Sequence, residues 1–313
     1  MKRITSLILI LSMGTAMVYC QTDANEPIEI TETEKPTVKP VGLIAEDNFE
    51  SGTWNNFWVR DWRQCCEYSA QFQSDVVRSG QYAVRFELDY LDGQYQIING
   101  TKNNGTRSSA NFGDYERYGK IGTEEWYGLS TYLEPPYDPD PCGELIFQWH
   151  GQADYDLGEG SLSPPLALYL EDGEYVVKLR HTDKRVATNN DLVVQKLFVE
   201  PYVAGQWVDW IFHMKWDYKG SGNGFVEVWK NGVQVVDYQG PNCYNDLNNL
   251  FWTMGVYKWP WKTCQTGEDF PACCAENGRP YDDCNSNVTN RVMYVDNFKV
   301  AGAGATLEDM KLD

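Results

Sequence analysis

Gln148 and His150 are the residues of this chain whose types and spacing most directly suggest chemistry. They lie in the run Phe147-Gln148-Trp149-His150, and alternate side chains of an extended strand share one face. An amide and an imidazole therefore point the same way. An imidazole can exchange a proton near neutral pH, and the chain has only three histidines. A histidine on a strand is also commonly a hydrogen-bonded structural residue, so spacing alone leaves both interpretations open.

Basic residues gather shortly after this run, in a chain that is otherwise acidic. Lys178 and Arg180 lie on a predicted strand, and Lys184 and Arg185 follow it, while the formal net charge is -19. The cluster suits a polyanionic ligand that Lys178 and Arg180 would contact. The alternative is a solvated strand edge on which positive charges prevent aggregation. The net charge itself argues against a nucleic acid or an anionic membrane as the partner.

Short runs bounded by turn residues dominate the chain from residue 43 onward. Asn231-Gly232 and Asp172-Gly173 each separate two alternating runs, which predicts two tight hairpins. Helical periodicity is scarce, and neither βαβ alternation nor a repeat is present, so we expect an all-β fold: an antiparallel two-sheet sandwich of the jelly-roll (concanavalin-like) type. The predicted strands are 44–49, 81–90, 125–133, 144–152, 166–170, 175–181, 193–199, 207–216, 225–230, 233–238, 254–259 and 292–300.

The run 207–216 shows how one of these strands should be oriented. Its alternate positions Val208, Trp210, Phe212 and Met214 are apolar, which predicts a face turned to the core. His213 lies on the opposite face, and we assign it a structural role. The 12 Trp and 20 Tyr of the chain allow a large core and leave flat side chains for stacking on sugar rings.

The N-terminus predicts export. Residues 1–20 combine Lys2 and Arg3 with an apolar run too short to span a bilayer, as in a signal peptide. Cleavage before Cys20 would leave a lipid-anchored lipoprotein at the cell surface, and cleavage after it a secreted protein; no other membrane insertion is expected. Residues 21–41 read as a disordered Thr/Glu/Pro linker, and 42–313 as a single domain that we expect to be monomeric.

Eight cysteines remain after Cys20 is set aside. An even number in an oxidising compartment predicts up to four disulfides, whose pairing the sequence does not give. A zinc site is disfavoured, because paired Cys-x-x-Cys spacing with nearby histidines is lacking. The eight are Cys65, Cys66, Cys142, Cys243, Cys264, Cys273, Cys274 and Cys284.

Seven segments in order resemble the heparin lyase and glucuronan lyase group of polysaccharide lyases, and they cover most of residues 43–302. Arg107 is followed by Ser108-Ser109-Ala110, where that group often has an acidic residue, and the Cys-rich stretch 264–284 is not part of the pattern. These departures bear on the substrate more than on the fold. The segments are 78–88, 122–130, Phe147-Gln-Trp-His-Gly151, Pro164-Pro-Leu-Ala-Leu168, Trp207-Val-Asp-Trp210, Val228-Trp-Lys-Asn-Gly232 and Gly255-Val-Tyr-Lys258.

The resemblance implies a jelly roll that cleaves an acidic, uronate-containing polysaccharide by β-elimination, with His150 and Tyr257 at the catalytic centre. Elimination needs a group that neutralises the uronate carboxylate, a base for the C5 proton and an acid for the departing O4. His150 and Tyr257 can take the two proton-transfer roles in either order. Gln148, with Arg180 or Arg107, could neutralise the carboxylate.

Tyr257 would need cationic neighbours to act as a base. A free tyrosine has a pKa near ~10, and Lys258 and Lys262 flank Tyr257 in the sequence. We therefore expect Lys258 to lie at the substrate together with Arg107.

Acidic residues near the two ends of the domain predict a structural Ca²⁺. Asp47, Glu50 and Asp296 supply hard oxygen ligands on strands that we expect to be neighbours. Acidic turns without a metal are the alternative. No organic cofactor is expected.

Three function classes stay open. The first is a lyase on a glucuronate-containing chain of the glucuronan or ulvan type. The second is a non-catalytic sugar-binding jelly roll, which would not need His150 with Tyr257. The third, a glycoside hydrolase, would need two carboxylic acids at a set separation and is disfavoured because no strand carries the expected acidic pattern.

Overall fold

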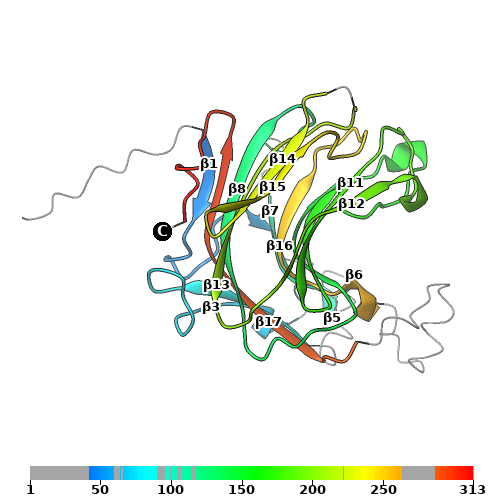
Figure 1. The fold of residues 1–313 in the computed structure, drawn as a ribbon. Helices are drawn as coiled ribbons and strands as arrows, with labels where there is room; N and C mark the ends of the chain where they lie inside the picture. The colour runs from blue at the N-terminus through cyan, green and yellow to red at the C-terminus, as the bar shows by residue number, and fades with distance from the viewer. Residues whose placement is uncertain are drawn as a thin grey trace, which may run out of the picture. The chain divides into compact units, whose positions relative to one another are not determined.

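The chain folds into two antiparallel sheets that pack face to face (Figure 1). The computed structural model describes residues 42–59, 64, 66–89, 96–98, 101–103, 107–113, 118–220, 222–262 and 286–312. Every strand pairing among these residues is antiparallel. The predicted all-β, two-sheet sandwich is confirmed.

The first sheet has eight strands in the order β15-β14-β13-β8-β17-β4-β3, with β1 also paired to β17. Its strands are β1 (Leu43–Asp47), β3 (Ala70–Gln73), β4 (Ala83–Asp89), β8 (Glu124–Leu133), β13 (Trp207–Lys215), β14 (Phe225–Lys230), β15 (Val233–Gln239) and β17 (Asn290–Gly302).

The second sheet has seven strands in the order β12-β11-β10-β9-β16-β7-β2. Its strands are β2 (Trp58–Val59), β7 (Arg107–Phe112), β9 (Glu144–His150), β10 (Leu166–Glu171), β11 (Glu174–His181), β12 (Val193–Pro201) and β16 (Phe251–Tyr257). A separate hairpin joins β5 (Gln96–Ile98) to β6 (Thr101–Asn103). The short helices are η1 (Glu67–Ser69), η3 (Tyr155–Leu157), η4 (Asn189–Asp191) and η5 (Trp259–Lys262).

The main core lies between the sheets and follows the alternation read from the sequence. On β13, Val208, Trp210, Phe212 and Met214 are all buried in it, as predicted. The two predicted hairpins are present. Asp172 and Asn231 adopt φ values of 49° and 50°, and each is followed by a glycine with positive φ. Positive φ at both central residues is typical of the type I′ turn, whose twist matches that of the flanking strands.

A line of β-bulges crosses the seven-stranded sheet. Bulges occur between β16 and β9 at Met254/Tyr257, between β10 and β9 at Leu168/Tyr169, and between β11 and β12 at Val177/Lys178. A bulge places two residues opposite one and bends the strand locally. Gly255, with φ of 113°, lies in the first of them, where an added Cβ would come within 2.3 Å of a backbone oxygen.

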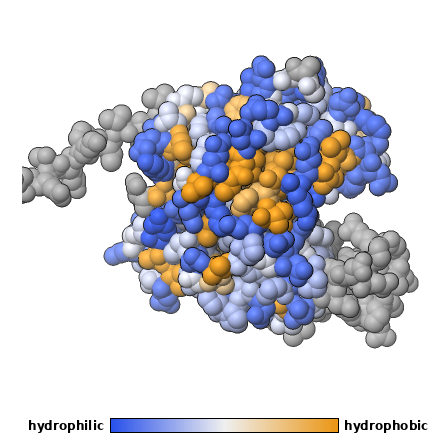
Figure 2. All heavy atoms as spheres, viewed as in Figure 1, coloured by the Kyte–Doolittle hydropathy of each residue, from blue (hydrophilic) through white to orange (hydrophobic). Residues whose placement is uncertain are grey.

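The edge strands of both sheets expose valines. Val194 on β12 and Val233 on β15 are more than half exposed, and hydrophobic side chains gather over the region of β14 and β15 in Figure 2. Lys196 interrupts the valines of β12, a placement that discourages pairing with another sheet. No helix in the described part of the chain is long and apolar enough to cross a membrane.

The described cysteines include both disulfide-bonded and free residues, and the predicted upper limit of four disulfides is not reached. Cys66 and Cys142 are each disulfide-bonded, but Cys243 is free and fully buried. Burial raises the pKa of the Cys243 thiol well above its usual value, so this thiol is unreactive. With Cys243 unpaired, the eight cysteines can form three disulfides at most.

Candidate active site

One face of the seven-stranded sheet carries most of the predicted site residues. Phe147, Trp149 and Trp252 point into the main core, so Gln148 and His150 point to the other face, which we call the site face. Register pairs place on it a row of residues that are polar except for Ala167. From β7 to β12 the row reads Asn111, Thr253, Gln148, Ala167, Lys178 and Lys196.

Three polar atoms on this face are buried without a hydrogen-bond partner among the described residues. They are Gln148 Oε1, Ser109 Oγ and Arg107 Nη1. Gln148 is 1 % exposed. Ser109 and Arg107 lie on β7, opposite Gly255 and Tyr257 of β16. A buried polar group without a partner is costly, so such a concentration indicates that a polar ligand completes the site.

His150 lies at one end of the β9–β16 ladder. It is paired with Phe251, and the two rings stack with centroids 5.1 Å apart. Its Nδ1 lies 2.6 Å from the carbonyl oxygen of Gly151. A carbonyl only accepts, so Nδ1 carries the proton and the basic lone pair of the neutral ring is on Nε2.

Tyr257 lies at the other end of that ladder, opposite Leu145. The guanidinium carbon of Arg107 lies 3.3 Å from the centre of the Tyr257 ring. Burial lowers the pKa of Arg107, and the interaction with Tyr257 opposes this shift. The rings of Tyr169 and Trp259 complete the surroundings.

His150 and Tyr257 do not touch. Six positions of β16 separate the Phe251 and Tyr257 levels, roughly 15 to 20 Å at about 3.3 Å per residue with allowance for the bulge. The row that contains Gln148 lies between them. The two rings therefore flank the buried amide from opposite ends.

The predicted basic residues of β11 are also on the site face but are engaged with protein groups. Arg180 Nη1 donates to the hydroxyl of Tyr169 at 2.8 Å and to the carbonyl of Pro164 at 3.0 Å. Burial raises the pKa of Tyr169, and Arg180 opposes the rise. Lys178 forms an ion pair with Glu171.

Lys258 is not on this face. Its side chain is fully buried, with Nζ 2.8 Å from Asp140 Oδ2 and 3.1 Å from Glu144 Oε2. Arg291 Nε also contacts Glu144, at 3.1 Å. A buried ammonium held by two carboxylates cannot reach a polysaccharide, so the structure contradicts the assignment of Lys258 to substrate binding. The cation beside Tyr257 is Arg107.

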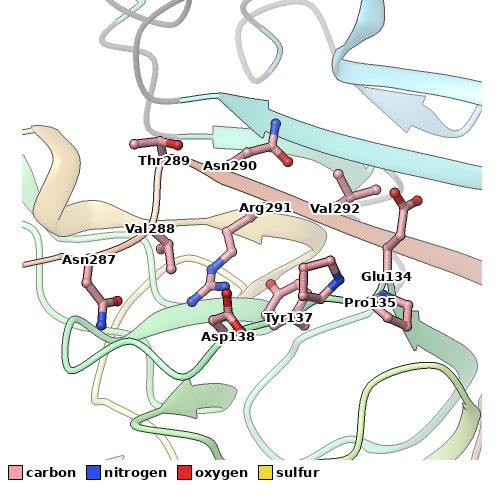
Figure 3. Close-up of a pocket in the computed structure, with 11 residues that line it drawn as sticks. Glu134, Pro135, Tyr137, Asp138, Asn287, Val288, Thr289, Asn290, Arg291 and Val292 are labelled. Carbon is pink, nitrogen blue, oxygen red and sulfur yellow. The ribbon is translucent and has the colours of Figure 1, made fainter.

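A pocket of about 340 Å³ borders this buried ion cluster (Figure 3). It lies between residues 134–138 and 287–292, and Figure 3 shows Arg291 reaching toward Tyr137. Arg291 is already paired with Glu144, and the lining adds the carboxylates of Glu134 and Asp138. Such a lining repels a polyanion. The pocket is therefore not the substrate site.

A second charged cluster ties together the loops next to His150. Asp154 pairs with Arg185 at 2.8 Å and accepts a hydrogen bond from the backbone of Leu247 at 3.2 Å. Ligand atoms of Asp154, Glu159 and Asp246 lie within 4.8 Å of one another. Burial raises the pKa of Asp246 to about 7, with the two other carboxylates adding to the rise. Arg185, a member of the predicted basic cluster, is therefore paired with Asp154 and stabilises the packing of these loops.

The predicted calcium ligands separate into two groups. Asp47 accepts hydrogen bonds from the Phe49 backbone at 2.9 Å and from the Trp58 indole at 2.8 Å, which is a structural role. Asp296 is fully buried, and burial raises its pKa to about 6, with Glu50 adding to the rise. Glu50, which accepts backbone hydrogen bonds from Gln81 and Tyr82, lies near enough to Asp296 to add to this rise, so these two carboxylates could share a cation.

His213 lies on β13 of the eight-stranded sheet. Nδ1 contacts Glu227 at 2.7 Å and Nε2 contacts Glu124 at 3.1 Å. The ring stacks on Trp126 with centroids 3.6 Å apart. These contacts account for His213 without a catalytic role.

The sequence reasoning missed Ser109, Asn111, Thr253 and Tyr169. Thr253 Oγ1 donates to Asn111 Oδ1 at 2.7 Å. Thr253 and Tyr169 could have been found, because they alternate with core residues on strands that were predicted at least in part. Ser109 and Asn111 lie on β7, which was not predicted.

Comparison with known proteins adds a family. The model of the family described as polysaccharide lyase matches residues 49–299. No curated protein matches the chain. Among solved structures, the endo-β-1,4-glucuronan lyase of the fungus Trichoderma reesei superposes with a TM-score of 0.60 at 17% identity, covering 82% of this chain and 98% of that one.

Two other similar structures align less well. The cellulose-induced protein Cip1 has a TM-score of 0.47 at 12% identity, covering 82% of this chain and 96% of that one. The alginate lyase AlgAT5 of polysaccharide lyase family 7 has a TM-score of 0.43 at 11% identity, covering 76% and 84%. The glucuronan lyase superposition bears out the predicted jelly-roll sandwich.

The family match covers most of the chain, and this protein belongs to the polysaccharide lyase family. It is a carbon–oxygen lyase that acts on uronic-acid polysaccharides. The resemblance read from the sequence is confirmed, and the hydrolase and the non-catalytic binding module are set aside.

Proposed function

We propose that this lyase cleaves a glucuronate-containing polysaccharide of the glucuronan or ulvan type by β-elimination on the site face. One observation carries the proposal: the unpartnered polar atoms of Gln148 and Ser109 lie between two groups that can transfer protons, His150 and Tyr257, and that of Arg107 lies beside Tyr257. A uronate in this position would give the buried polar atoms their missing partners.

In this proposal, the amide of Gln148 and the guanidinium of Arg107 hold the uronate carboxylate. Hydrogen bonds and positive charge at the carboxylate stabilise the negative charge that develops when the C5 proton leaves. Tyr257 lies against Arg107, and its hydroxyl can take the proton or return it to O4. Nε2 of His150, at the other end of the β9–β16 ladder, is the second group that can transfer a proton.

The product of the reaction distinguishes this proposal. We expect incubation with glucuronan or ulvan to raise ultraviolet absorbance, because elimination between C4 and C5 creates a double bond conjugated with the carboxylate. Absorbance and reducing ends should increase together. New reducing ends without absorbance would show hydrolysis, and retention of the polymer without cleavage would show a binding module.

A structural Ca²⁺ held by Glu50 and Asp296 remains part of the proposal. These residues lie near the two ends of the chain, and Asp296 also accepts hydrogen bonds from the backbone N–H groups of Arg78 and Ser79. A bound cation would stabilise the folded state only. Chelation is expected to lower the Tm by several degrees without abolishing turnover at low temperature. Immediate loss of turnover with the fold intact would contradict this separation.

The signal-like residues 1–20 and the linker 21–41 lie outside the described residues. We propose from their sequence that the protein is exported, either secreted or held at the cell surface by a lipid on Cys20. A polysaccharide too large to enter a cell is consistent with that location.

A further inference from the structure

Glu171, Lys178 and Lys196 form a charged cluster on the site face, apart from the residues that flank Gln148. Lys178 Nζ pairs with Glu171 Oε1, and Lys196 Nζ lies 3.3 Å from Glu171 Oε2. Lys178 and Lys196 are themselves opposite each other in the β11–β12 register. Two ammonium groups therefore share one carboxylate.

Lys178 and Lys196 lie in the same row as Gln148 but further along it, whereas Glu171 lies at the end of β10, opposite Glu174. Gln148 on β9 is opposite Ala167 on β10, which is opposite Lys178 on β11, and Lys196 follows on β12. At about 4.8 Å between strands, the lysines are about 10 and 14 Å from the Gln148 strand. A sugar chain that crosses the strands over Gln148 would bring its next units to them.

We propose that Lys178 and Lys196 bind the acidic group of a sugar that flanks the reacting one, and that Glu171 occupies the place of this group in the free protein. This inference rests on the proposed function, because it places the reacting sugar at Gln148. The subsite would select polymers that carry negative charge beyond the reacting uronate.

The geometry explains why Glu171 can give way. Like charges directly opposite each other on neighbouring strands are unfavourable, so the lysine pair requires an anion. Burial lowers the pKa of Lys178, with Arg180 and Lys196 contributing and Glu171 opposing the shift. The Glu171–Lys196 pair is the weaker of the two, because the side chain of Lys196 is 52% exposed and ion pairs open to solvent are weak, whereas the side chains of Glu171 and Lys178 are 21% and 15% exposed. Replacing one anion by another therefore keeps the lysines neutralised.

Carboxylate and sulfate fit this cluster equally well, since a lysine ammonium recognises either as a point charge. A polymer built of uronates presents a carboxylate on each flanking sugar. A sulfated polymer presents a sulfate instead. A neutral flanking sugar offers the lysines nothing.

The test is binding to a catalytically silenced protein, Tyr257→Phe, measured by affinity electrophoresis in gels with polyglucuronate, with a sulfated uronate polymer such as ulvan, or with a neutral glucan. Lys196→Gln should weaken binding to an acidic polymer by about three- to tenfold. Glu171→Gln should tighten it by about threefold, because the internal competitor is gone. Both changes should shrink at high salt.

Controls of matched charge are Lys311→Gln and Glu308→Gln, an exposed pair in the C-terminal segment, which should leave binding unchanged. Changes confined to polyglucuronate assign the subsite to carboxylate, and changes confined to ulvan assign it to sulfate. The proposal is overturned if Glu171→Gln weakens binding or leaves it unchanged, if Lys196→Gln has no effect, or if the silenced protein binds no acidic polymer.

The proposed function is tested separately by the ultraviolet assay on the wild-type protein. A wild type that makes no unsaturated product, with the charge variants still shifting binding, would refute the reaction and retain the subsite. The opposite pattern would refute the subsite alone.

Discussion

Tyr257→Phe is expected to lower kcat by about 100-fold or more while leaving binding of the polysaccharide nearly unchanged. The substitution keeps the ring that packs under Arg107 and removes the hydroxyl, the only group of this side chain that can carry a proton. The measurement is the initial rate of ultraviolet absorbance, together with polymer binding by affinity electrophoresis.

Tyr155→Phe is the matched control, since Tyr155 is 70% exposed on η3 and the change removes the same atom. Its rate should equal that of the wild type. A fully active Tyr257→Phe variant would refute the assignment. Tyr244 could not take its place, because it is buried and donates a hydrogen bond from its hydroxyl to the carbonyl of Ser163 at 2.7 Å.

His150→Ala in the same assay tests whether His150 and Tyr257 act on the same transition state. If both groups act on one transition state, the double variant should lose little more than the worse single variant. Losses that multiply would show that His150 contributes a separate step, such as holding a neighbouring sugar.

Lys258→Met is expected to destabilise the fold by about 3 to 5 kcal/mol. The substitution leaves Asp140 and Glu144 buried with Arg291 as the one remaining cation of the cluster. Removing one member of a buried ion pair leaves the charge of the other member buried without a partner, which costs far more than losing a surface pair. Urea unfolding monitored by tryptophan fluorescence measures the loss.

Lys120→Met, at an exposed position, is the control and should change stability by less than about 0.5 kcal/mol. Lys258→Arg keeps the charge and should lose less than Lys258→Met. A Lys258→Met protein of unchanged stability but weaker substrate binding would restore the role that sequence adjacency to Tyr257 suggested.

The error about Lys258 shows where sequence reasoning stops. Adjacent residues on a strand point to opposite faces, so a lysine next to Tyr257 is the residue least suited to share its surroundings. Arg107, 150 positions away, becomes its neighbour through the pairing of β7 with β16. Such pairings depend on which distant strands meet, and the alternation within one strand does not contain that information.

The sequence predicted more of the fold than of the site. Alternation placed the core face of β13 and the face shared by Gln148 and His150, and turn residues placed two hairpins. β7 was missed because Arg-Ser-Ser-Ala-Asn-Phe is poor in the β-branched residues that mark strands. Its polar residues lie on the site face, so the features that hide the strand are those that equip the site.

The line of bulges across the seven-stranded sheet constrains how this enzyme can change over time. His150 and Gln148 lie on one side of it and Tyr257 on the other. Substitutions on either side can alter one half of the site and leave the other in place. Deleting one residue near Gly255 would instead move Tyr257 to the core-facing position of Val256. A shift of one residue turns every side chain beyond it to the opposite face of the sheet. We expect related enzymes to keep the length of β16 together with its Gly255 and Tyr257, and to accommodate insertions in the loops beyond His150.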